Sequence, residues 1–301
     1  ARYLADQCVE VRTLLLQGHG TRPGDMVTAS AEVWREQVRN HFIALSQEVD
    51  RAFIGGFSLG GALATDYALS ETGPRPAGLI AVAPAWQLNG LRDYLWLAPI
   101  ADVFADFVEK EPELNPVKYE SFSFNAGSQI GDVISAAQSR IIQKESLNMP
   151  LFLAATEADS VINLEYLVTQ FRERFSNPGN AMMIFRDTRK PWPVAQADER
   201  IRFLSSYLPD ANILEFSHQS LLIAPDNELY GLGAPLQRCL EPNNISLEGC
   251  RQLPEEDLWF SAWHDTERPV YTSRLTYNPW FDDLAEAVGT FIQANESGEA
   301  P

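Results

Sequence analysis

The chain has 301 residues, of which 45% are hydrophobic, and its formal net charge is -18 at pH 7. This length and composition can bury a full core and exclude a mostly disordered chain. The negative charge argues against nucleic acid or an anionic membrane surface as the main partner, because both need a cationic face. The sequence also lacks an apolar run of about 18 residues that could span a membrane. Small neutral or cationic molecules fit this chain better as partners.

The first part of the chain predicts alternating strands and helices. A helix ends near Asp6, and the apolar run from Val9 to Leu16 predicts a strand. A glycine-rich loop from Gly18 to Asp25 follows. Ser30 is the expected N-cap of a helix whose apolar residues recur at helical spacing up to Leu45.

The stretch Gly55 to Gly61 has the residue types of a sharp turn from strand to helix. The run Arg51 to Ile54 predicts the strand before it, and Leu59 to Leu69 predicts the helix after it. A residue at such a corner has a strained backbone, and the chain on either side comes very near it. We expect glycine at positions 56 and 60 because a Cβ there would clash. Ser58 would then project from the end of the strand, and it is the candidate nucleophile.

The middle of the chain changes character. Gly78 to Pro84 is a short apolar run, typical of a strand covered on both faces, so we expect a mostly parallel sheet. Residues 86–148 are predicted to be a mainly helical insertion, with one helix from about Gln129 to Gln143. This insertion would lie over the site as a cap. Two ordinary crossover helices are the alternative.

Strand signals return in the last half of the chain. The expected elements are strands at 150–155 and 181–185, helices at 163–175 and 279–294, and a last apolar run, Ile213 to Phe216. We therefore predict an α/β fold with its core in residues 1–85 and 149–301. The second part of this core would carry insertions around 187–211 and 225–275.

A serine hydroxyl needs a base to act as a nucleophile, usually a histidine oriented by a carboxylate. Of the four histidines, His218 follows the last apolar run, which would put it at the same sheet edge as Ser58. His264, in a loop with no clear strand before it, is the alternative. His19 belongs to the glycine-rich loop, and His41 belongs to a helix.

The carboxylate should also leave the end of a strand. Asp159 lies just beyond the predicted strand 150–155, between the serine and the histidine in chain order. Glu157 is its nearest competitor, and either residue could instead be a solvated acid of a turn.

These residues together carry a resemblance. Gly18-His19-Gly20, the stretch Gly55 to Gly61, Ala155 to Val161 and Ser217-His218 look like the α/β-hydrolase superfamily, within its branch of carboxylesterases, monoacylglycerol lipases and lysophospholipases. The resemblance implies a sheet flanked by helices and a Ser58, Asp159, His218 triad that works through an acyl-enzyme. It also implies that the backbone N–H of Leu59 donates to the oxyanion. We expect no cofactor and no metal.

One part of the family's pattern does not match. The second oxyanion donor of the family comes from a His-Gly-type loop on a strand earlier than Gly18-His19-Gly20. We expect that the N-terminal strands are missing from this chain because it is a fragment; the alternative is that another group supplies the donor.

The triad-ordered residues beside an aromatic-rich insertion favour hydrolysis of small-molecule carboxylic esters, of the acyl ester, lysophospholipid or monoacylglycerol type. An apolar acyl chain would lie under the cap residues Leu91, Tyr94, Leu95, Trp96 and Leu97. A catalytically silent binding protein on the same fold is an alternative, as is an amide or peptide hydrolase.

Cysteine use bears on the compartment. Cys239 and Cys250 flank a polar loop and are spaced to form a disulfide, with two free thiols as the alternative. A disulfide would indicate the periplasm, the cell surface or the exterior, whereas free thiols would leave the cytoplasm open.

Overall fold

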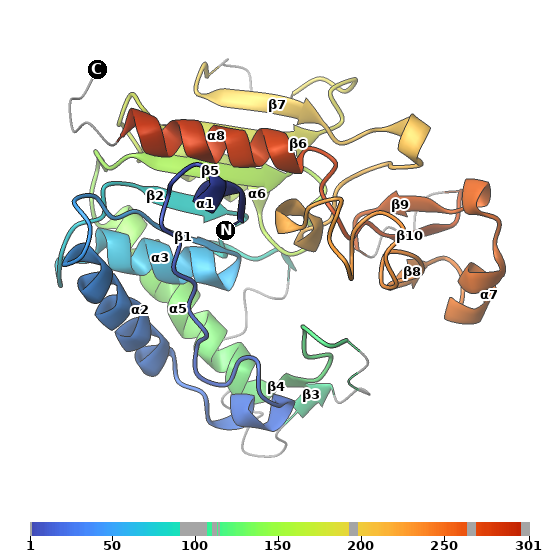
Figure 1. Ribbon diagram of the computed structural model, residues 1–301, viewed down its shortest axis with the longest axis horizontal. Coiled ribbons are helices and arrows are strands. Elements are labelled where there is room, and N and C mark those ends of the chain that lie inside the picture. The colour runs from blue at the N-terminus through green and yellow to red at the C-terminus, as the bar shows by residue number, and fades with distance from the viewer. Residues whose placement is uncertain are drawn as a thin grey trace.

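A five-stranded parallel sheet forms the centre of the molecule (Figure 1). The computed structural model describes residues 2–90, 107–109, 113, 115–192, 198–263 and 269–295. The strands are β1 (Ile54–Phe57), β2 (Leu79–Val82), β5 (Leu151–Thr156), β6 (Ala181–Arg186) and β7 (Ile201–Ser205), in the order β1-β2-β5-β6-β7. Every neighbouring pair is parallel. The carboxyl ends of these strands therefore meet at one edge of the sheet.

Helices cover both faces of this sheet, which explains the continuous apolar runs of the central strands. All six residues of β5 are buried. Figure 1 shows α2, α3 and α5 on one side of the sheet and α8 on the other, with α1 beside α8. The helices are α1 (Arg2–Asp6), α2 (Ala31–Ser46), α3 (Leu59–Leu69), α5 (Phe124–Ile142), α6 (Leu164–Glu173), α7 (Leu247–Gln252) and α8 (Phe281–Ala294).

Helix α2 shows how sequence pattern becomes packing. Trp34, Val38 and Phe42 fall on one face and are buried, as their helical spacing predicts. Ser30 stands at the N-cap position, but its side chain makes no capping hydrogen bond. The N–H of Ala31 instead donates to Gln129 Oε1 at 2.8 Å. A side chain of α5 thus takes part in the cap of α2, which a local sequence pattern cannot reveal.

The predicted strand from Val9 to Leu16 does not form. The segment has no regular strand pairing, and β2 is the only strand that pairs with β1 in the described part of the chain. Residues of this segment and of β1 instead line a cavity of about 1010 Å³ between them. A strand needs a hydrogen-bonded neighbour. Without one, Val11 and Leu15 of this apolar run are exposed, at 37% and 70%.

The stretch 187–211, expected to be an insertion, contains the last strand of the central sheet. Strand β7 pairs with β6 from Met182 opposite Ile201 to Arg186 opposite Ser205. The run Ile213 to Phe216, expected to be that last strand, forms only isolated bridges at Ile213. Both end residues of the run are fully buried, so its apolar character reflects burial in the core and not a place in the sheet.

Residues 86–148 include two short strands that the sequence did not predict, β3 (Phe107–Glu109) and β4 (Phe122–Ser123). Helix α5 begins five residues before its predicted start at Gln129, because Ser123 caps it by accepting from the N–H of Ala126. This helix packs against α3. The cap residues from Leu91 to Leu97 lie outside the described residues, and the division into core and cap stays a prediction.

A second, smaller sheet lies apart from the central one (Figure 1). Its strands are β8 (Pro242–Asn243), β9 (Trp259–Ser261) and β10 (Thr272–Arg274), in the order β8-β10-β9. Cys239 and Cys250 form a disulfide at its side. Short 3-10 turns complete the described chain at Pro23–Thr28, Pro209–Ala211, Gln219–Leu222 and Glu255–Asp257. In the part of the chain described, no helix combines the length and apolar character needed to span a bilayer.

Candidate active site

Ser58 stands at the corner between a strand and a helix. Strand β1 ends at Phe57, α3 begins at Leu59, and Ser58 has φ 52° and ψ −118°. A positive φ is strained for a residue with a side chain. The strand begins at Ile54, later than predicted, and it includes Gly55, where a Cβ would lie 2.7 Å from the carbonyl oxygen of Ile80.

The glycines around Ser58 have different roles from those predicted. A Cβ on Gly56 would lie 2.2 Å from the carbonyl carbon of Gly60, so Gly56 is needed where the turn folds back on itself. A Cβ on Gly60 would meet no atom within 4 Å. The close packing on the helix side falls on Gly61, where a Cβ would lie 2.9 Å from Pro84 Cβ. The sequence prediction for Gly60 was therefore wrong.

Ser58, His218 and Asp159 form a chain of hydrogen bonds at the carboxyl edge of the sheet. His218 Nε2 lies 3.0 Å from Ser58 Oγ, and His218 Nδ1 lies 2.7 Å from Asp159 Oδ2. His218 and Asp159 are both buried. Because an ionised carboxylate can only accept, Nδ1 carries the hydrogen, and Nε2 is then free to accept the proton of the serine.

The turn after β5 holds Asp159 firmly. Its second carboxylate oxygen, Oδ1, accepts from the N–H groups of Val161 and Ile162, both at 2.8 Å. The amide nitrogen of Asn89 donates to the carbonyl oxygens of Asp159 and Ile162. Both carboxylate oxygens are thus occupied, which fixes the plane of the carboxylate that faces the imidazole.

His218 is held from the other side by contacts of its own loop. Ser217 Oγ donates to the carbonyl oxygen of Leu275 at 2.6 Å. The Thr156 hydroxyl lies 3.3 Å from the carbonyl oxygen of Phe216, two residues before the histidine. The ring of Phe57 contacts the imidazole, with 4.7 Å between the ring centroids. These contacts set the ring orientation although no strand precedes His218.

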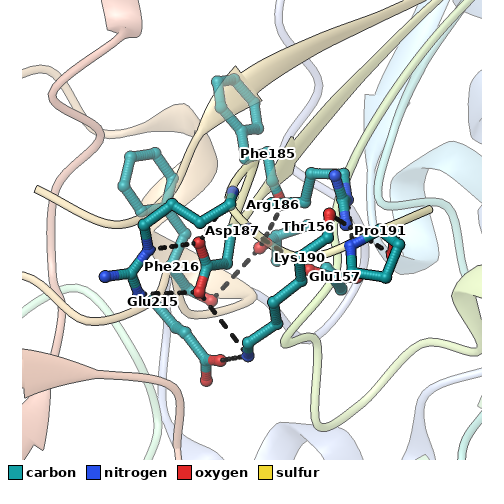
Figure 2. A network of polar contacts seen from close by, with 10 residues as sticks. Thr156, Glu157, Phe185, Arg186, Asp187, Lys190, Pro191, Glu215 and Phe216 are labelled. Carbon is teal, nitrogen blue, oxygen red and sulfur yellow. Dashed lines mark hydrogen bonds and ion pairs between the residues drawn. The ribbon is translucent and has the colours of Figure 1, made fainter.

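A polar network lies behind this edge (Figure 2). Glu157, the competing acid, accepts from the N–H of Asp187 at 3.3 Å, and its other oxygen lies 3.6 Å from Arg186 Nε. The structure therefore pairs Glu157 with the end of β6 and not with His218. In the same network Arg189 binds Asp187 through two hydrogen bonds of 2.8 Å. The hydrogen bonds from Arg189 hold the pKa of Asp187 at about 2.

The other histidines have different surroundings. His19 Nδ1 lies 3.3 Å from the carbonyl oxygen of Gln17, and its ring meets Trp34 edge to face. His41 lies on the exposed side of α2 and lines the cavity beside β1. His264 lies outside the described residues. Among the residues that are described, no three His, Cys, Asp or Glu side chains gather as a metal site would require.

The first N–H groups of α3 have no partner within the helix, as at any helix start. The N–H group of Leu59 comes directly after the serine. The resemblance assigns this place to an oxyanion donor. The positive end of the helix dipole adds to the attraction for a negative charge there. This role of Leu59 stays a prediction.

The arrangement can activate a nucleophile. With its proton passed to Nε2, Ser58 Oγ could attack an electrophilic carbon, and the carboxylate would stabilise the imidazolium that forms. Sequence reasoning singled out the three side chains but missed the contacts of Asn89 and Thr156. Both reach residues about 60 to 70 positions further along the chain, and no short motif signals such a pairing.

Comparisons with known proteins agree with this architecture. A family model described as serine aminopeptidase, S33, matches residues 1–125. No curated protein sequence matches the chain. A solved structure titled for LipS and LipT, two metagenome-derived lipolytic enzymes, shares 18% identity with a TM-score of 0.54, and the match covers 62% of this chain and 76% of that one.

Two lipases are also among the similar structures. The monoacylglycerol lipase of Paleococcus ferrophilus shares 19% identity with a TM-score of 0.39, covering 50% of this chain. A soluble variant of the monoglyceride lipase of Saccharomyces cerevisiae shares 14% with a TM-score of 0.43, covering 56%. The chain spans 65% of the length of each. The parallel sheet and the likeness to the metagenome-derived enzyme show that the chain has an α/β-hydrolase fold, and the family model matches its first 125 residues.

Proposed function

We propose that this protein is a serine hydrolase that cleaves carboxylic esters of small molecules. The hydrogen-bonded chain from Ser58 through His218 to Asp159 carries the proposal, with distances of 3.0 and 2.7 Å. Its geometry supports a buried acid, a base and a nucleophile on a strained corner. The lipolytic activity named for a structural relative favours an ester substrate.

The reaction would proceed in two halves. Ser58 Oγ attacks the carbonyl carbon of the ester while His218 takes the hydroxyl proton, and the N–H of Leu59 donates to the developing oxyanion. His218 then passes the proton to the alcohol as it leaves, which gives an acyl-enzyme. Water, activated by the same imidazole, releases the acid. An apolar acyl group under residues 91–97 remains part of this proposal.

A second candidate function differs in the bond that is cleaved, an amide in place of an ester. The matching family model bears the description of an aminopeptidase, and the same triad can cleave an amide. A panel of p-nitrophenyl esters of increasing acyl length, set beside aminoacyl p-nitroanilides, separates the two. We expect turnover of the esters. Turnover of the anilides alone would overturn the choice of ester.

A fluorophosphonate probe tests the nucleophile itself. The probe should label the wild-type chain, and Ser58→Ala should abolish the labelling while leaving the folded chain intact by circular dichroism. Ser139→Ala is a matched control, since Ser139 is an exposed serine of α5 whose hydroxyl donates to the carbonyl oxygen of Ser135. A folded wild-type chain that no probe labels would instead support a silent binding protein, and labelling that survives in Ser58→Ala would refute this serine.

The disulfide between Cys239 and Cys250 supports the further proposal that the protein works in an oxidising compartment. Thiol titration of the chain as purified from its native host tests this point. Full reactivity of both cysteines there would overturn it.

A further inference from the structure

Asn89 contacts the turn that carries Asp159. Its side-chain nitrogen donates to the carbonyl oxygen of Asp159 at 2.8 Å and to that of Ile162 at 2.9 Å. An amide group has two hydrogens, so both of its donors are used on this one turn. The contacts are partly buried, which makes each hydrogen bond more valuable than an exposed one.

The turn is closed from both sides. On its inner side Asp159 Oδ1 accepts from the N–H groups of Val161 and Ile162. On its outer side Asn89 ties together the carbonyl groups at its two ends. Once the turn fixes Oδ1, the direction of the second oxygen, Oδ2, is fixed as well, and it faces His218 Nδ1. By holding this turn, Asn89 influences the direction in which the Asp159 carboxylate points.

Backbone pairing fixes the position of Asn89 in turn. The N–H of Asn89 donates to the carbonyl oxygen of Val161 at 2.9 Å, and the N–H of Asn163 donates to that of Gln87 at 2.9 Å. A bridge between Leu88 and Ile162 lies between these two bonds. Residues 87–89 and 161–163 thus form a short antiparallel pair, so the Asn89 side chain is aimed at the turn by its own backbone.

The same segment also contacts the nucleophile. The N–H of Ala85 donates to the carbonyl oxygen of Ser58 at 2.9 Å, and the N–H of Ser58 donates to that of Val82 at 3.0 Å. Residues 82–89 therefore touch the serine at one end and the turn of Asp159 at the other. A rigid link of this kind holds the two ends of the triad at a fixed separation.

We propose that Asn89 is a positioning residue, which sets the Asp159 carboxylate for its hydrogen bond to His218. The catalytic consequence rests on the proposed function. Asn89→Ala removes both donors from the turn, and the carboxylate then turns away from Nδ1. A misplacement of about 1 Å in a catalytic group can lower a rate about 100-fold, and loss of the carboxylate itself costs about 10⁴-fold.

Steady-state kinetics on a p-nitrophenyl ester test the catalytic part. We expect kcat of Asn89→Ala to fall about 10- to 100-fold, with KM within about threefold of wild type. Asn163→Ala is the matched control, because the variant keeps the backbone N–H that donates to Gln87, and the Asn163 side chain caps α6 by accepting from the N–H of Tyr166. Its kcat should stay within about twofold. An unchanged kcat in Asn89→Ala, or an equal loss in Asn163→Ala, would overturn the proposal.

Proton NMR tests the positioning directly and does not depend on turnover. The hydrogen between His218 Nδ1 and Asp159 should give a resonance far downfield in the wild-type chain and in Asn163→Ala, and it should be lost or broadened in Asn89→Ala. If Asn89→Ala does not fold, Asn89→Ser replaces it. This variant keeps one donor and should weaken the signal in part. A signal that persists unchanged in the folded variant would refute the role of Asn89. Failure of the proposed function is recognised separately, by a wild-type chain that the fluorophosphonate does not label.

Discussion

Gly56 and Gly60 approach each other so closely that a Cβ on Gly56 would lie 2.2 Å from the carbonyl carbon of Gly60. The approach is one-sided, since a Cβ on Gly60 would point into open space. The atoms that a Cβ on Gly56 would meet belong to the backbone of the turn, and not to a flexible side chain that could move away. The contact belongs to the corner that presents Ser58, so its loss would move the proposed nucleophile.

Alanine at each of these glycines should therefore give opposite results. Gly56→Ala forces backbone apart and should destabilise the fold by about 3 kcal/mol or more. Gly60→Ala adds a methyl group without a clash in the first turn of α3, and should stabilise it by up to about 1 kcal/mol because alanine has the better helix propensity. Urea unfolding of both variants measures the difference. Equal destabilisation of the two would contradict this account of the turn.

The pair of Asp187 and Arg189 predicts a dependence of stability on acid. Two hydrogen bonds from Arg189 lower the pKa of Asp187 from 3.8 to about 2. An acid whose pKa is lower in the folded state binds its proton more readily when unfolded, so its contribution is full above pH 4 and is lost as the pH falls toward 2. The contribution is about 1 to 2 kcal/mol, because Arg189 is more than half exposed and water screens the pair.

Asp187→Asn tests this pair. The variant should be less stable than wild type by about that amount at pH 7, and the difference should shrink to near zero at pH 2. Urea unfolding at several pH values measures it. Asp210→Asn is a matched control, since Asp210 lies in an exposed turn. A difference that is independent of pH would show that the hydrogen bonds of Asp187 matter and its charge does not.

The disulfide between Cys239 and Cys250 should stabilise the region of the small sheet. Closing a loop of this length, with a sequence separation of 11 residues, restricts the unfolded chain by about 3 kcal/mol in the loop-entropy picture. The double variant Cys239→Ser with Cys250→Ser should lose about that much stability. Cys8→Ser should lose little, because Cys8 is free and exposed. An unchanged unfolding midpoint in the double variant would contradict the stabilising role.

The local motif around Ser58 was predicted well from sequence because its requirements are local. A strand, a strained corner and a helix of small residues occupy consecutive positions, so the spacing alone places Leu59 at the helix start and Ser58 before it. Even there the part played by Gly60 was wrong, since the chain folds back onto Gly56 and Pro84 packs against Gly61. Which glycine is needed depends on the atoms that lie near it in the folded chain, and sequence spacing does not reveal them.

The strands were predicted less well because an apolar run does not show pairing: Ile213 and Phe216 are buried outside any ladder, whereas Val11 and Leu15 are exposed. Val9 to Leu16 and Ile213 to Phe216 both read as strands, yet neither has a neighbour that completes a ladder. Strand β7 was missed because its residues are only partly buried at the edge of the sheet and a polar stretch precedes them. His218 nevertheless reaches the expected edge, because contacts with β5 replace the strand that was predicted.

Thr156 makes one of those contacts, and its hydroxyl can be tested apart from its size. The side chain is fully buried, and its oxygen lies 3.3 Å from the carbonyl oxygens of Phe185 and of Phe216. Thr156→Val keeps the shape and removes the donor, whereas Thr156→Ser keeps the donor and removes a methyl group. Each variant should lose about 1 to 2 kcal/mol of stability, the first from an unpaired buried carbonyl and the second from a small cavity.

Their effects on the proposed active site should differ. Only the valine variant frees the carbonyl of Phe216, two residues before His218, so it should slow fluorophosphonate labelling of Ser58 several-fold while the serine variant stays near wild type. Because the two losses of stability are similar, a difference in labelling reports the position of the histidine loop and not general loosening of the fold. Equal labelling rates for the two variants would mean that the contacts of Ser217 and Phe57 suffice to hold His218.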